Sequence, residues 1–364
     1  MFGLFKSKRN YFIGVDFGTS AVKIVEFCYR NQRINLENYG WVDLGLIPNS
    51  ENNQLKFETT YENKLKIYLA KIIQKMKLNS DSAFVSLPGF NGLVTLIDFP
   101  EMKDDELEKA IQFEAHKYIP TPLDEVSLSW DVISRTKDKG QTESGQIKQK
   151  RIQVILVAAP KKEISKYEKI FDYSGLSIQV IELETFALSR ALIGEDLGTF
   201  LIIDIGARAT NIVLVDKGII KANRNIDAGG NEVTNTIADS LNVSKVRAEM
   251  LKKDKKDLLN SKELSIVIPT FELINNEVLR IISAYKDKNK SGRIDGIILS
   301  GGGGKLVGLD EYFSKSIGIK TIVGDPWKKI YFEERMKPLI NDLGGSFSVA
   351  IGLAMRGVEE YKRK

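Results

Sequence analysis

Residues 12–27 read FIGVDFGTSAVKIVEF, and residues 200–215 read FLIIDIGARATNIVLV. Each stretch begins with an apolar run, continues with Asp-x-Gly and small or polar residues, and ends in a second β-prone run. This pattern predicts two antiparallel strands joined by a short glycine-containing turn. One such hairpin is usually only a turn, but its repetition indicates a duplicated architecture with two similar lobes.

The two turns have the chemistry of a phosphate-binding loop. Glycine lets the backbone bend and approach a ligand closely, and successive amides and hydroxyls in the bend can hold phosphate oxygens. The turn residues that we expect to contact phosphate are Gly18, Thr19, Ser20, Gly206, Ala207 and Thr210. We expect Lys23 to add a positive point charge for the same phosphates.

An aspartate ends the first predicted strand of each hairpin. The carboxylates of Asp16 and Asp204 cannot favour bare phosphate, but they suit a hydrated Mg²⁺ ion, which keeps most of its waters. We therefore place Asp16 and Asp204 on the metal side of the expected site and count both among the candidate catalytic residues.

Three further features follow in order along the chain. A Gly-Gly pair precedes a stretch with helical character, a Glu and a Lys lie three residues apart on one predicted helix face, and a strand-like run leads into four glycines and a lysine. A surface ion pair and a flexible connector are the plainer interpretations of the last two. The residues that we expect to contact a nucleotide here are Gly229, Gly230, Glu249, Lys252, Gly301, Gly302, Gly303 and Lys305.

The composition limits other functions. The 364 residues include 43% hydrophobic and 28% charged side chains, which is typical of a folded globular protein. The net charge of +5 is modest and the lysines are spread along the chain, so we expect no nucleic-acid partner. Cys28 and His116 are the only cysteine and histidine, too few for a disulfide or a Cys/His zinc site. We interpret His116 as an ordinary surface histidine.

The chain has no membrane-spanning pattern, because no run of about 18 apolar residues occurs. Its first nine residues, MFGLFKSKR, lack the long apolar region of a secretory signal. Three apolar and three basic side chains in that stretch could touch an anionic membrane, and a frayed terminus is the alternative. The single cysteine fits a reducing cytosol, so we expect a cytoplasmic protein.

With these residues in order, the chain resembles the actin-like ATPases. Residues 16–23 resemble the first phosphate loop of that superfamily, residues 204–211 the second, and residues 300–305 the adenosine loop. Glu184 falls where the superfamily has its first connecting helix and often an acid that orients water, and residues 350–354 resemble the second connecting helix. The resemblance implies ATP and Mg²⁺ as cofactors and makes Glu184 a candidate catalytic residue.

Two residues of the second loop depart from that pattern. Arg208 stands where many relatives have glycine, and Asn211 replaces the histidine that actin carries at the corresponding place. An amide can hold a water molecule but cannot accept its proton. We therefore expect ATP hydrolysis to be weak or absent, with ATP serving mainly to clamp the lobes together.

A closer resemblance, to the PilM family of type IV pilus assembly proteins, lies in an insertion within the first lobe. It is carried by SLPG at 86–89, FPEM at 99–102 and QFEAHKYIP at 112–120. The residue pattern predicts strands at 93–99, 126–134 and 151–158, helices at 104–119 and 162–173, and an exposed mobile loop at 136–150. This arrangement resembles the inserted subdomain 1C of FtsA and PilM.

The resemblance implies an α/β fold of the actin-like type, with two lobes of duplicated ribonuclease-H-like subdomains. On that basis subdomain 1A comprises residues 1–90, 176–198 and 346–364, and subdomain 1C comprises residues 91–175. Subdomain 2A comprises residues 199–228 and 293–345, and subdomain 2B comprises residues 229–292.

The PilM resemblance also implies a partner. PilM proteins bind ATP and capture the N-terminal cytoplasmic peptide of the inner-membrane protein PilN in a groove between subdomains 1A and 1C. We expect residues 87–93 and the strand after Pro122 to line that groove. The chain would then be peripheral to the inner membrane through its partners, and contacts with other pilus platform components and self-association stay open.

Two other functions fit the same fold. An FtsA-like division protein would carry a C-terminal amphipathic anchor, whereas the sequence here ends in EEYKRK without an apolar face. A small-molecule kinase would need a substrate-aligning carboxylate in the cleft, and no sugar-kinase pattern supplies one. Peptide binding and phosphoryl transfer are the measurements that separate these alternatives.

Overall fold

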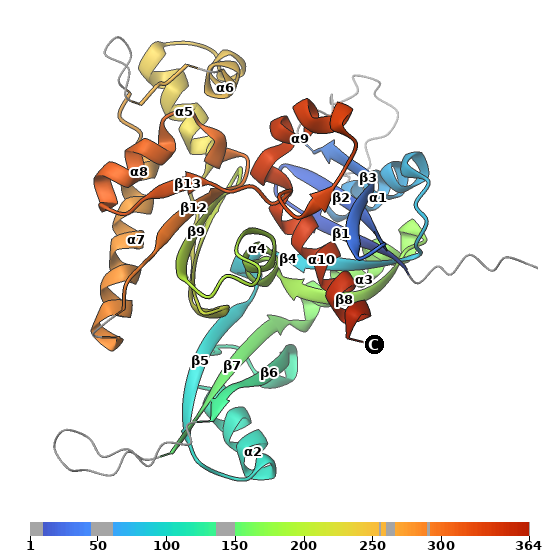
Figure 1. The fold of residues 1–364 in the computed structure, drawn as a ribbon, viewed down its shortest axis with the longest axis vertical. Helices are drawn as coiled ribbons and strands as arrows, with labels where there is room; N and C mark the ends of the chain where they lie inside the picture. The colour runs from blue at the N-terminus through green and yellow to red at the C-terminus, as the bar shows by residue number, and fades with distance from the viewer. Residues whose placement is uncertain are drawn as a thin grey trace, which may run out of the picture.

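The computed structural model describes residues 10–44, 61–135, 150–254, 256–259, 266–289 and 292–363. Three β-sheets organise these residues (Figure 1). Two larger sheets form the cores of two lobes, and a smaller third sheet projects from the first lobe. The loop expected to be mobile at 136–150 lies outside the described residues except for Lys150, as do residues 1–9.

The first sheet contains the first predicted hairpin. β1 and β2 pair antiparallel with Asp16 opposite Lys23, and β4 runs parallel to β1. The strand order is β14-β3-β2-β1-β4-β8. The strands are β1 Tyr11–Phe17, β2 Ala21–Arg30, β3 Arg33–Asp43, β4 Ser82–Leu87, β8 Ser177–Leu183 and β14 Ile330–Tyr331.

The second sheet repeats this arrangement. β9 and β10 pair antiparallel with Asp204 opposite Asn211, and β12 runs parallel to β9. The order β11-β10-β9-β12-β13 corresponds to β3-β2-β1-β4-β8 of the first sheet, which confirms the duplicated architecture. The strands are β9 Thr199–Ile205, β10 Thr210–Asp216, β11 Ile219–Ile226, β12 Gly296–Ser300 and β13 Thr321–Val323.

The third sheet is the predicted insertion. β5 (Leu93–Pro100), β7 (Arg151–Pro160) and β6 (Val126–Arg135) are antiparallel in that order, and each is one or two residues longer than predicted. The helix α2 (Asp104–Ala115) packs its buried Leu107 and Ile111 into one apolar core with these strands. The inserted unit therefore has a core of its own, separate from the two lobes.

The predicted helix at 104–119 is wrong at its C-terminal end, because α2 stops at Ala115. Beyond it, the amides of Lys117 and Tyr118 donate to the carbonyls of Glu114 and Ala115, so the chain tightens to i→i−3 turns. The Ile119 amide still donates to the Ala115 carbonyl, and Pro120 disfavours helical backbone at Ile119, so the helix could not continue beyond this point.

The helices cover both lobes and fill the space between them. α1 and α3 pack on the first sheet, α5, α7 and α8 pack on the second, and α4 and α10 lie between the two sheets (Figure 1). A Cβ atom at Gly352 would lie 2.0 Å from the Ala187 carbonyl oxygen, so only glycine lets α10 approach α4 this closely. The helices not yet bounded are α1 Tyr61–Met76, α3 Lys161–Ser174, α4 Glu184–Leu192, α5 Gly230–Leu241, α6 Lys245–Lys253, α7 Pro269–Lys288, α8 Leu309–Ile317, α9 Lys337–Leu343 and α10 Ser348–Lys362.

The chain returns from the second lobe to the first just after Gly324. The expected division placed this return after residue 345. β14 pairs with β3, and Trp327 and Leu343 pack with Phe27 of β2. We propose that the boundary of subdomain 2A lies near Gly324, in place of residue 345. The other subdomain bounds stay as proposed. Within the described ranges, no helix combines the length and apolar character needed to cross a bilayer.

Candidate functional site

The two predicted turns close in the same way. The Gly18 amide donates to the Ala21 carbonyl at 3.0 Å, and the Gly206 amide donates to the Ala209 carbonyl at 2.9 Å. A Cβ atom at Gly206 would lie 2.8 Å from that carbonyl oxygen, so the turn favours glycine. The sequence repeat is thus a repeat of backbone geometry.

The other turn residues divide into exposed and buried ones. Thr19 and Ser20 are exposed at the tip of the first turn, where their hydroxyls can reach a ligand. Thr210 is buried, and its hydroxyl donates to a backbone carbonyl at 2.7 Å. Arg208 pairs with Asp227 at 3.1 Å, so its side chain is held by an exposed carboxylate.

Asp16 and Asp204 occupy equivalent positions on β1 and β9. The buried Asp16 carboxylate lies 3.3 Å from Lys23 Nζ and accepts a hydrogen bond from the Ser86 hydroxyl at 3.2 Å. Burial raises the pKa of Asp204 to about 6; the Ser300 hydroxyl and Lys23 oppose this increase, and Asp16 adds to it. The two carboxylates therefore influence each other across the gap between the lobes.

Glu184, the first residue of α4, is the third carboxylate in this cleft. Burial raises its pKa to about 8, and repulsion from Asp204 and Asp16 adds to the increase. The Gly89 amide donates to Oε1 at 2.8 Å and Asn211 Nδ2 donates to it at 3.3 Å, which opposes the increase only in part. The neighbouring carboxylates thus disfavour a negative charge on Glu184.

Converging carboxylates with raised pKa values are stabilised by a cation. Within the part of the chain that the structure describes, no group of three or more His, Cys, Asp or Glu side chains could hold a metal ion. Carboxylates such as those of Asp16 and Asp204 are the ligand type of Mg²⁺, an ion that keeps most of its waters in nucleotide sites.

Asn211 lies beside Glu184 and has an unsatisfied oxygen. The residue is 3% exposed, and its Nδ2 is 3.5 Å from the Thr185 hydroxyl as well as 3.3 Å from Glu184. Its Oδ1 atom is buried and has no hydrogen-bond partner among the described residues. Because a buried polar atom without a partner is costly, this oxygen fits a water molecule or a ligand donor.

Lys23 and Lys305 bring positive charge to the cleft from the two lobes. The Lys305 ammonium group donates to the Asp342 carbonyl. Burial lowers the pKa of Lys305; the Asp342 carboxylate opposes this and the charge of Lys23 adds to it. Two ammonium groups that repel each other favour an anionic ligand between them.

The Gly-Gly pair after β11 is attached to the second turn. The Gly230 amide donates to the Gly206 carbonyl at 2.9 Å, and a Cβ atom at Gly229 would lie 2.6 Å from the same oxygen. Lys252 Nζ lies 2.9 Å from the Gly230 carbonyl oxygen and 2.6 Å from Glu249. The Glu249–Lys252 pair therefore adjoins the second turn and is not an isolated surface ion pair.

The glycine run after β12 lies against β9. Gly301 has a φ of 78°, and a Cβ atom there would lie 2.3 Å from the Ile205 carbonyl oxygen. A Cβ atom at Gly303 would lie 2.4 Å from the Ile205 side chain. Gly302 is exposed with open space around it, so its backbone is the part of the run that a ligand can approach.

Ser86, Gly89 and Ser300 were not among the residues predicted to contact nucleotide or metal. Ser86 and Gly89 belong to the SLPG motif, which carried the family resemblance, and Gly89 was expected to line the peptide groove. A Cβ atom at Gly89 would lie 3.0 Å from Asn211 Nδ2 and 3.2 Å from Glu184 Oε1, so the motif brings backbone to the cleft. The Pro-Gly pair that follows a strand-like apolar run was the sequence feature that could have indicated a loop at the cleft.

A groove of about 640 Å³ lies between the first lobe and the inserted sheet. β6, which follows Pro122, forms part of its wall, together with β7, β8, α4, α10 and the β10–β11 turn. None of residues 87–93 borders this groove; Gly89, Phe90, Gly92 and Leu93 border a separate cavity of about 320 Å³ beside β11. Apolar residues along the groove include Ile133, Val157, Ile181, Phe186, Ile220 and Met355.

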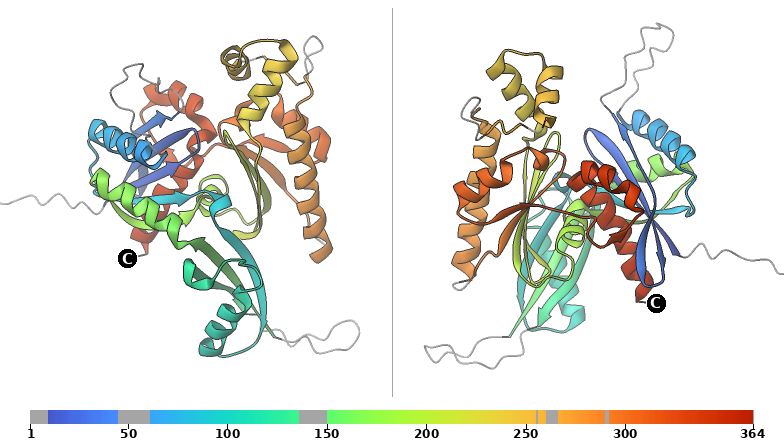
Figure 2. Two further views of the ribbon diagram at one scale, coloured as in Figure 1. Left: turned by 180° about the vertical axis from the view of Figure 1, so that it is seen from behind. Right: turned by 45° about the horizontal axis from the view of Figure 1, so that its top comes forward.

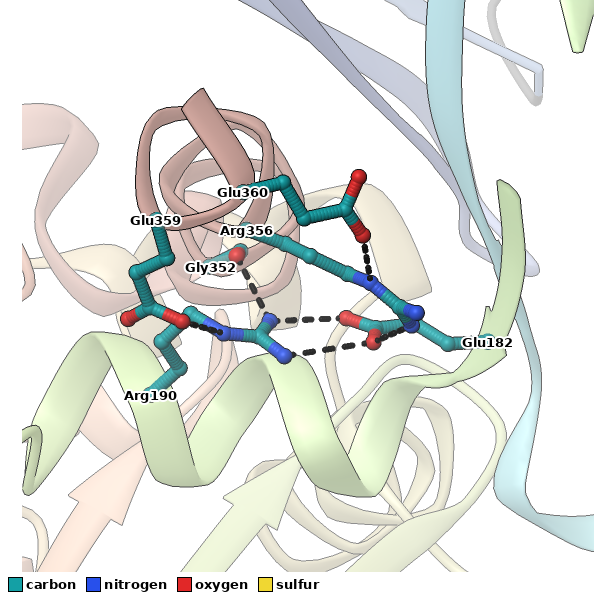
Figure 3. Close-up of polar contacts among 6 residues, drawn as sticks. All are labelled: Glu182, Arg190, Gly352, Arg356, Glu359 and Glu360. Atoms are coloured by element: carbon teal, nitrogen blue, oxygen red, sulfur yellow. Dashed lines mark hydrogen bonds and ion pairs between the residues drawn. The ribbon is translucent and has the colours of Figure 1, made fainter. Parts of the chain in front are cut away.

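An ion-pair network forms the wall of the groove where β8, α4 and α10 meet (Figure 3). The buried Glu182 carboxylate accepts hydrogen bonds from Arg190 at 2.8 and 3.2 Å and from Arg356 at 2.6 Å. Arg190 also pairs with Glu359 at 3.2 Å, and Arg356 pairs with Glu360 at 3.0 Å. One carboxylate bonded to two guanidinium groups fixes both helices relative to β8.

Comparison with known families and proteins gave two kinds of match. A family model described as Type IV pilus assembly protein PilM matches residues 14–358. The cell division protein FtsA of Streptococcus pneumoniae serotype 2 (strain D39 / NCTC 7466) is 21% identical over 355 residues, covering 86% of this chain and 75% of FtsA. FtsA of Enterococcus hirae is 20% identical over 350 residues, covering 86% and 78%.

Solved structures show the same fold. A PilM–PilN type IV pilus biogenesis complex matches with a TM-score of 0.76 and 23% identity, covering 95% of this chain and 98% of that chain. MreB 5 of Spiroplasma citri bound to AMPPNP matches with a TM-score of 0.55 and 14% identity, covering 97% and 98%. These matches show that the two lobes have the actin-like ATPase fold.

Proposed function

The chain belongs to the PilM family of type IV pilus assembly proteins, and from this membership we propose that it is an ATP-binding adaptor of the pilus inner-membrane assembly platform. In this role it would bind MgATP between its lobes and capture the N-terminal cytoplasmic peptide of a PilN-like inner-membrane protein. The family match over residues 14–358 and the fold shared with a PilM–PilN complex support the proposal.

The cleft between the hairpin turns would hold the nucleotide phosphates. Lys23 and Lys305 would compensate the phosphate charge, and Asp16 and Asp204 would hold Mg²⁺, which neutralises phosphate charge when bound. The other contacts expected from the second lobe would receive the ribose and base; they are Gly229, Gly230, Glu249, Lys252, Gly301, Gly302 and Gly303. The solved MreB 5 chain bound to AMPPNP shares this fold, which supports a nucleotide in the cleft.

Hydrolysis in this site would be weak or absent. In the nucleotide-free cleft, burial and then repulsion from Asp204 raise the pKa of Glu184 to about 8, so most of these carboxyl groups carry a proton at neutral pH and cannot take one from water. The unpartnered Asn211 Oδ1 can orient a water molecule but cannot take its proton. The arrangement favours a clamp that holds ATP over an enzyme that turns it over rapidly.

The observation that carries the adaptor function is the groove of about 640 Å³ between the first lobe and the inserted sheet. An extended peptide suits such a groove, because apolar side chains can enter it while the ion-pair network lies at its wall. The partner would hold the chain at the inner membrane, and we propose a cytoplasmic, peripheral location on this basis.

Peptide binding tests this proposal. A synthetic peptide with the cytoplasmic N-terminal sequence of a PilN-like protein from the same operon should bind with a Kd of about 1 μM or tighter. Ile133→Asp, which puts a charge into the groove, should weaken binding at least about ten-fold. Val246→Asp on α6 is the matched control, because Val246 is 73% exposed and outside the groove. Absence of binding with and without ATP would remove the adaptor function and leave the fold.

A further inference from the structure

We propose that the chain also binds an anionic lipid surface directly, through a basic and aromatic surface at one end of the first lobe. This surface, which we call the hairpin-tip surface, is defined by residues from three segments. They are Tyr29, Arg30, Arg33, Tyr331, Tyr361, Lys362 and Arg363. The inference goes beyond the adaptor function, because contact with lipid requires no protein partner.

Aromatic and cationic contacts join the end of β2 to the end of α10. The Tyr29 and Tyr361 ring centroids are 5.9 Å apart, and Lys362 Nζ lies 5.0 Å from the Tyr29 ring centroid. Figure 2 (right) shows the tip of the β2–β3 hairpin beside the C-terminal end of α10. Residues more than 300 positions apart in the sequence therefore form one surface.

The hairpin turn itself completes the surface. Asn31 and Gln32 have φ values of 52° and 57°, which give a tight turn and place Arg30 opposite Arg33. The Arg33 guanidinium lies 5.9 Å from the ring centroid of Tyr331 on the neighbouring strand. Two arginines and an exposed tyrosine are thereby held at the extreme end of the sheet.

The basic side chains of this surface are not held in ion pairs. Arg30, Arg33, Lys362 and Arg363 are all exposed, and none of them forms an ion pair within the described residues. The two acidic residues that precede them on α10 are already paired with Arg190 and Arg356 in the network of Figure 3. Four exposed cations in one place favour a polyanionic surface.

The tyrosines favour a lipid headgroup layer as that polyanion. Tyr331 is 58% exposed and Tyr361 is 36% exposed. Tyrosine has an apolar ring and a polar tip, which suits the boundary between acyl chains and headgroups.

The position of the surface agrees with the proposed function. Lys362 belongs both to the hairpin-tip surface and to the lining of the groove, and Ile34, next to Arg33, also lines the groove. If the groove receives a peptide from an inner-membrane protein, as proposed above, its mouth faces the bilayer, and so does the hairpin-tip surface. This step alone rests on the proposed function.

Vesicle sedimentation with the full chain and no other protein tests the inference. The chain should bind vesicles with about one-third phosphatidylglycerol, bind pure phosphatidylcholine vesicles far less, and lose affinity as salt rises. The variant Arg30→Gln/Arg33→Gln/Lys362→Gln should bind about 100-fold more weakly, since each cation near the surface contributes about five-fold.

A charge-matched control decides whether the surface is specific. Lys253→Gln/Arg280→Gln/Lys315→Gln removes the same charge from exposed residues of the second lobe and should bind like the parent chain. Equal losses in both triple variants, equal binding to both vesicle types, or preference for a single-stranded oligonucleotide would overturn the inference. Thermal melting checks folding, and the single variants Arg33→Gln and Lys362→Gln decide the matter if the triple variant unfolds. Because no PilN-like peptide is present, failure here leaves the adaptor proposal untouched.

Discussion

Glu184 links the chemistry of the cleft to protein stability. Its pKa is raised from 4.5 to about 8, chiefly by burial and then by repulsion from Asp204, so the folded state binds this proton more tightly than the unfolded state. The stabilising contribution of the group is complete below about pH 4.5 and is lost as pH rises through about 8. The nucleotide-free protein should therefore lose stability across this range.

Glu184→Gln should remove that loss, because an amide stays neutral while still accepting a hydrogen bond from the Gly89 amide. We expect the free energy of unfolding at about pH 8 to rise by about 1–3 kcal/mol relative to the parent chain, with little change at about pH 5. Urea unfolding at the two pH values measures the effect, and Glu168→Gln on an exposed face of α3 is the control. An equal change in the free energy of unfolding at both pH values would contradict the raised pKa of Glu184 as its cause.

Asp16 and Asp204 have equivalent places but different surroundings. Asp16 is 3.3 Å from Lys23, whereas burial raises the pKa of Asp204 to about 6 despite the opposing Ser300 and Lys23. If both hold Mg²⁺, Asp16→Ala and Asp204→Ala should each weaken MgATP binding by about 10- to 100-fold. Titration calorimetry with MgATP and with ATP in chelator measures this. Normal MgATP affinity in both variants would mean that the two-hairpin site is wrong.

The crossing of α4 and α10 depends on one glycine. A Cβ atom at Gly352 would lie 2.0 Å from the Ala187 carbonyl oxygen, and backbone cannot yield as a side chain can. We expect Gly352→Ala to lower the free energy of unfolding by about 3 kcal/mol or more, measured by urea unfolding. Gly296→Ala is the control, because its added methyl group would have no neighbour closer than 3.5 Å. Equal stability of the two variants would show that the helices can move apart at no cost.

The hairpins were predictable from sequence because their determinants are local. Alternating β-prone runs and a turn glycine lie within about 16 consecutive residues, and the structure reproduces both pairings, with Asp16 opposite Lys23 and Asp204 opposite Asn211. The three inserted strands were predictable for the same reason. The end of α2 was misjudged, because apolar spacing continues to Ile119 whereas the backbone changes to i→i−3 turns after Ala115.

Features that depend on distant segments could not be derived from the pattern. β14 has only two residues, too few for any periodicity, and its return to the first sheet is set by packing of Trp327 and Leu343. The Ser86 and Gly89 contacts to the cleft join segments 70 and 95 residues apart. The sequence was therefore enough to identify the loops of the candidate site. The residues that support these loops could be identified only from the folded structure.

The whole molecule consists of two similar lobes joined by α4 and α10, with the candidate nucleotide cleft between them (Figure 1). Lys23 from the first lobe and Lys305 from the second both face this cleft, and their mutual repulsion holds the pKa of Lys305 down in addition to its burial. An anion that contacts both lysines would relieve that repulsion and draw the lobes together. Nucleotide binding should therefore stabilise the two lobes as one unit.

At a concentration 100 times its Kd, MgATP should raise the free energy of unfolding by about 2.7 kcal/mol, and a non-hydrolysable analogue of equal affinity should do the same. If the nucleotide acts as a clamp, both nucleotides should stabilise the protein equally, because the gain in the free energy of unfolding depends on occupancy of the site and not on hydrolysis. Urea unfolding with each nucleotide measures it, and Lys23→Gln should reduce both effects together.

ATP incubated with the chain and candidate sugars should show no phosphoryl transfer. Transfer at ordinary kinase rates would contradict the adaptor role and favour a small-molecule kinase on the same fold.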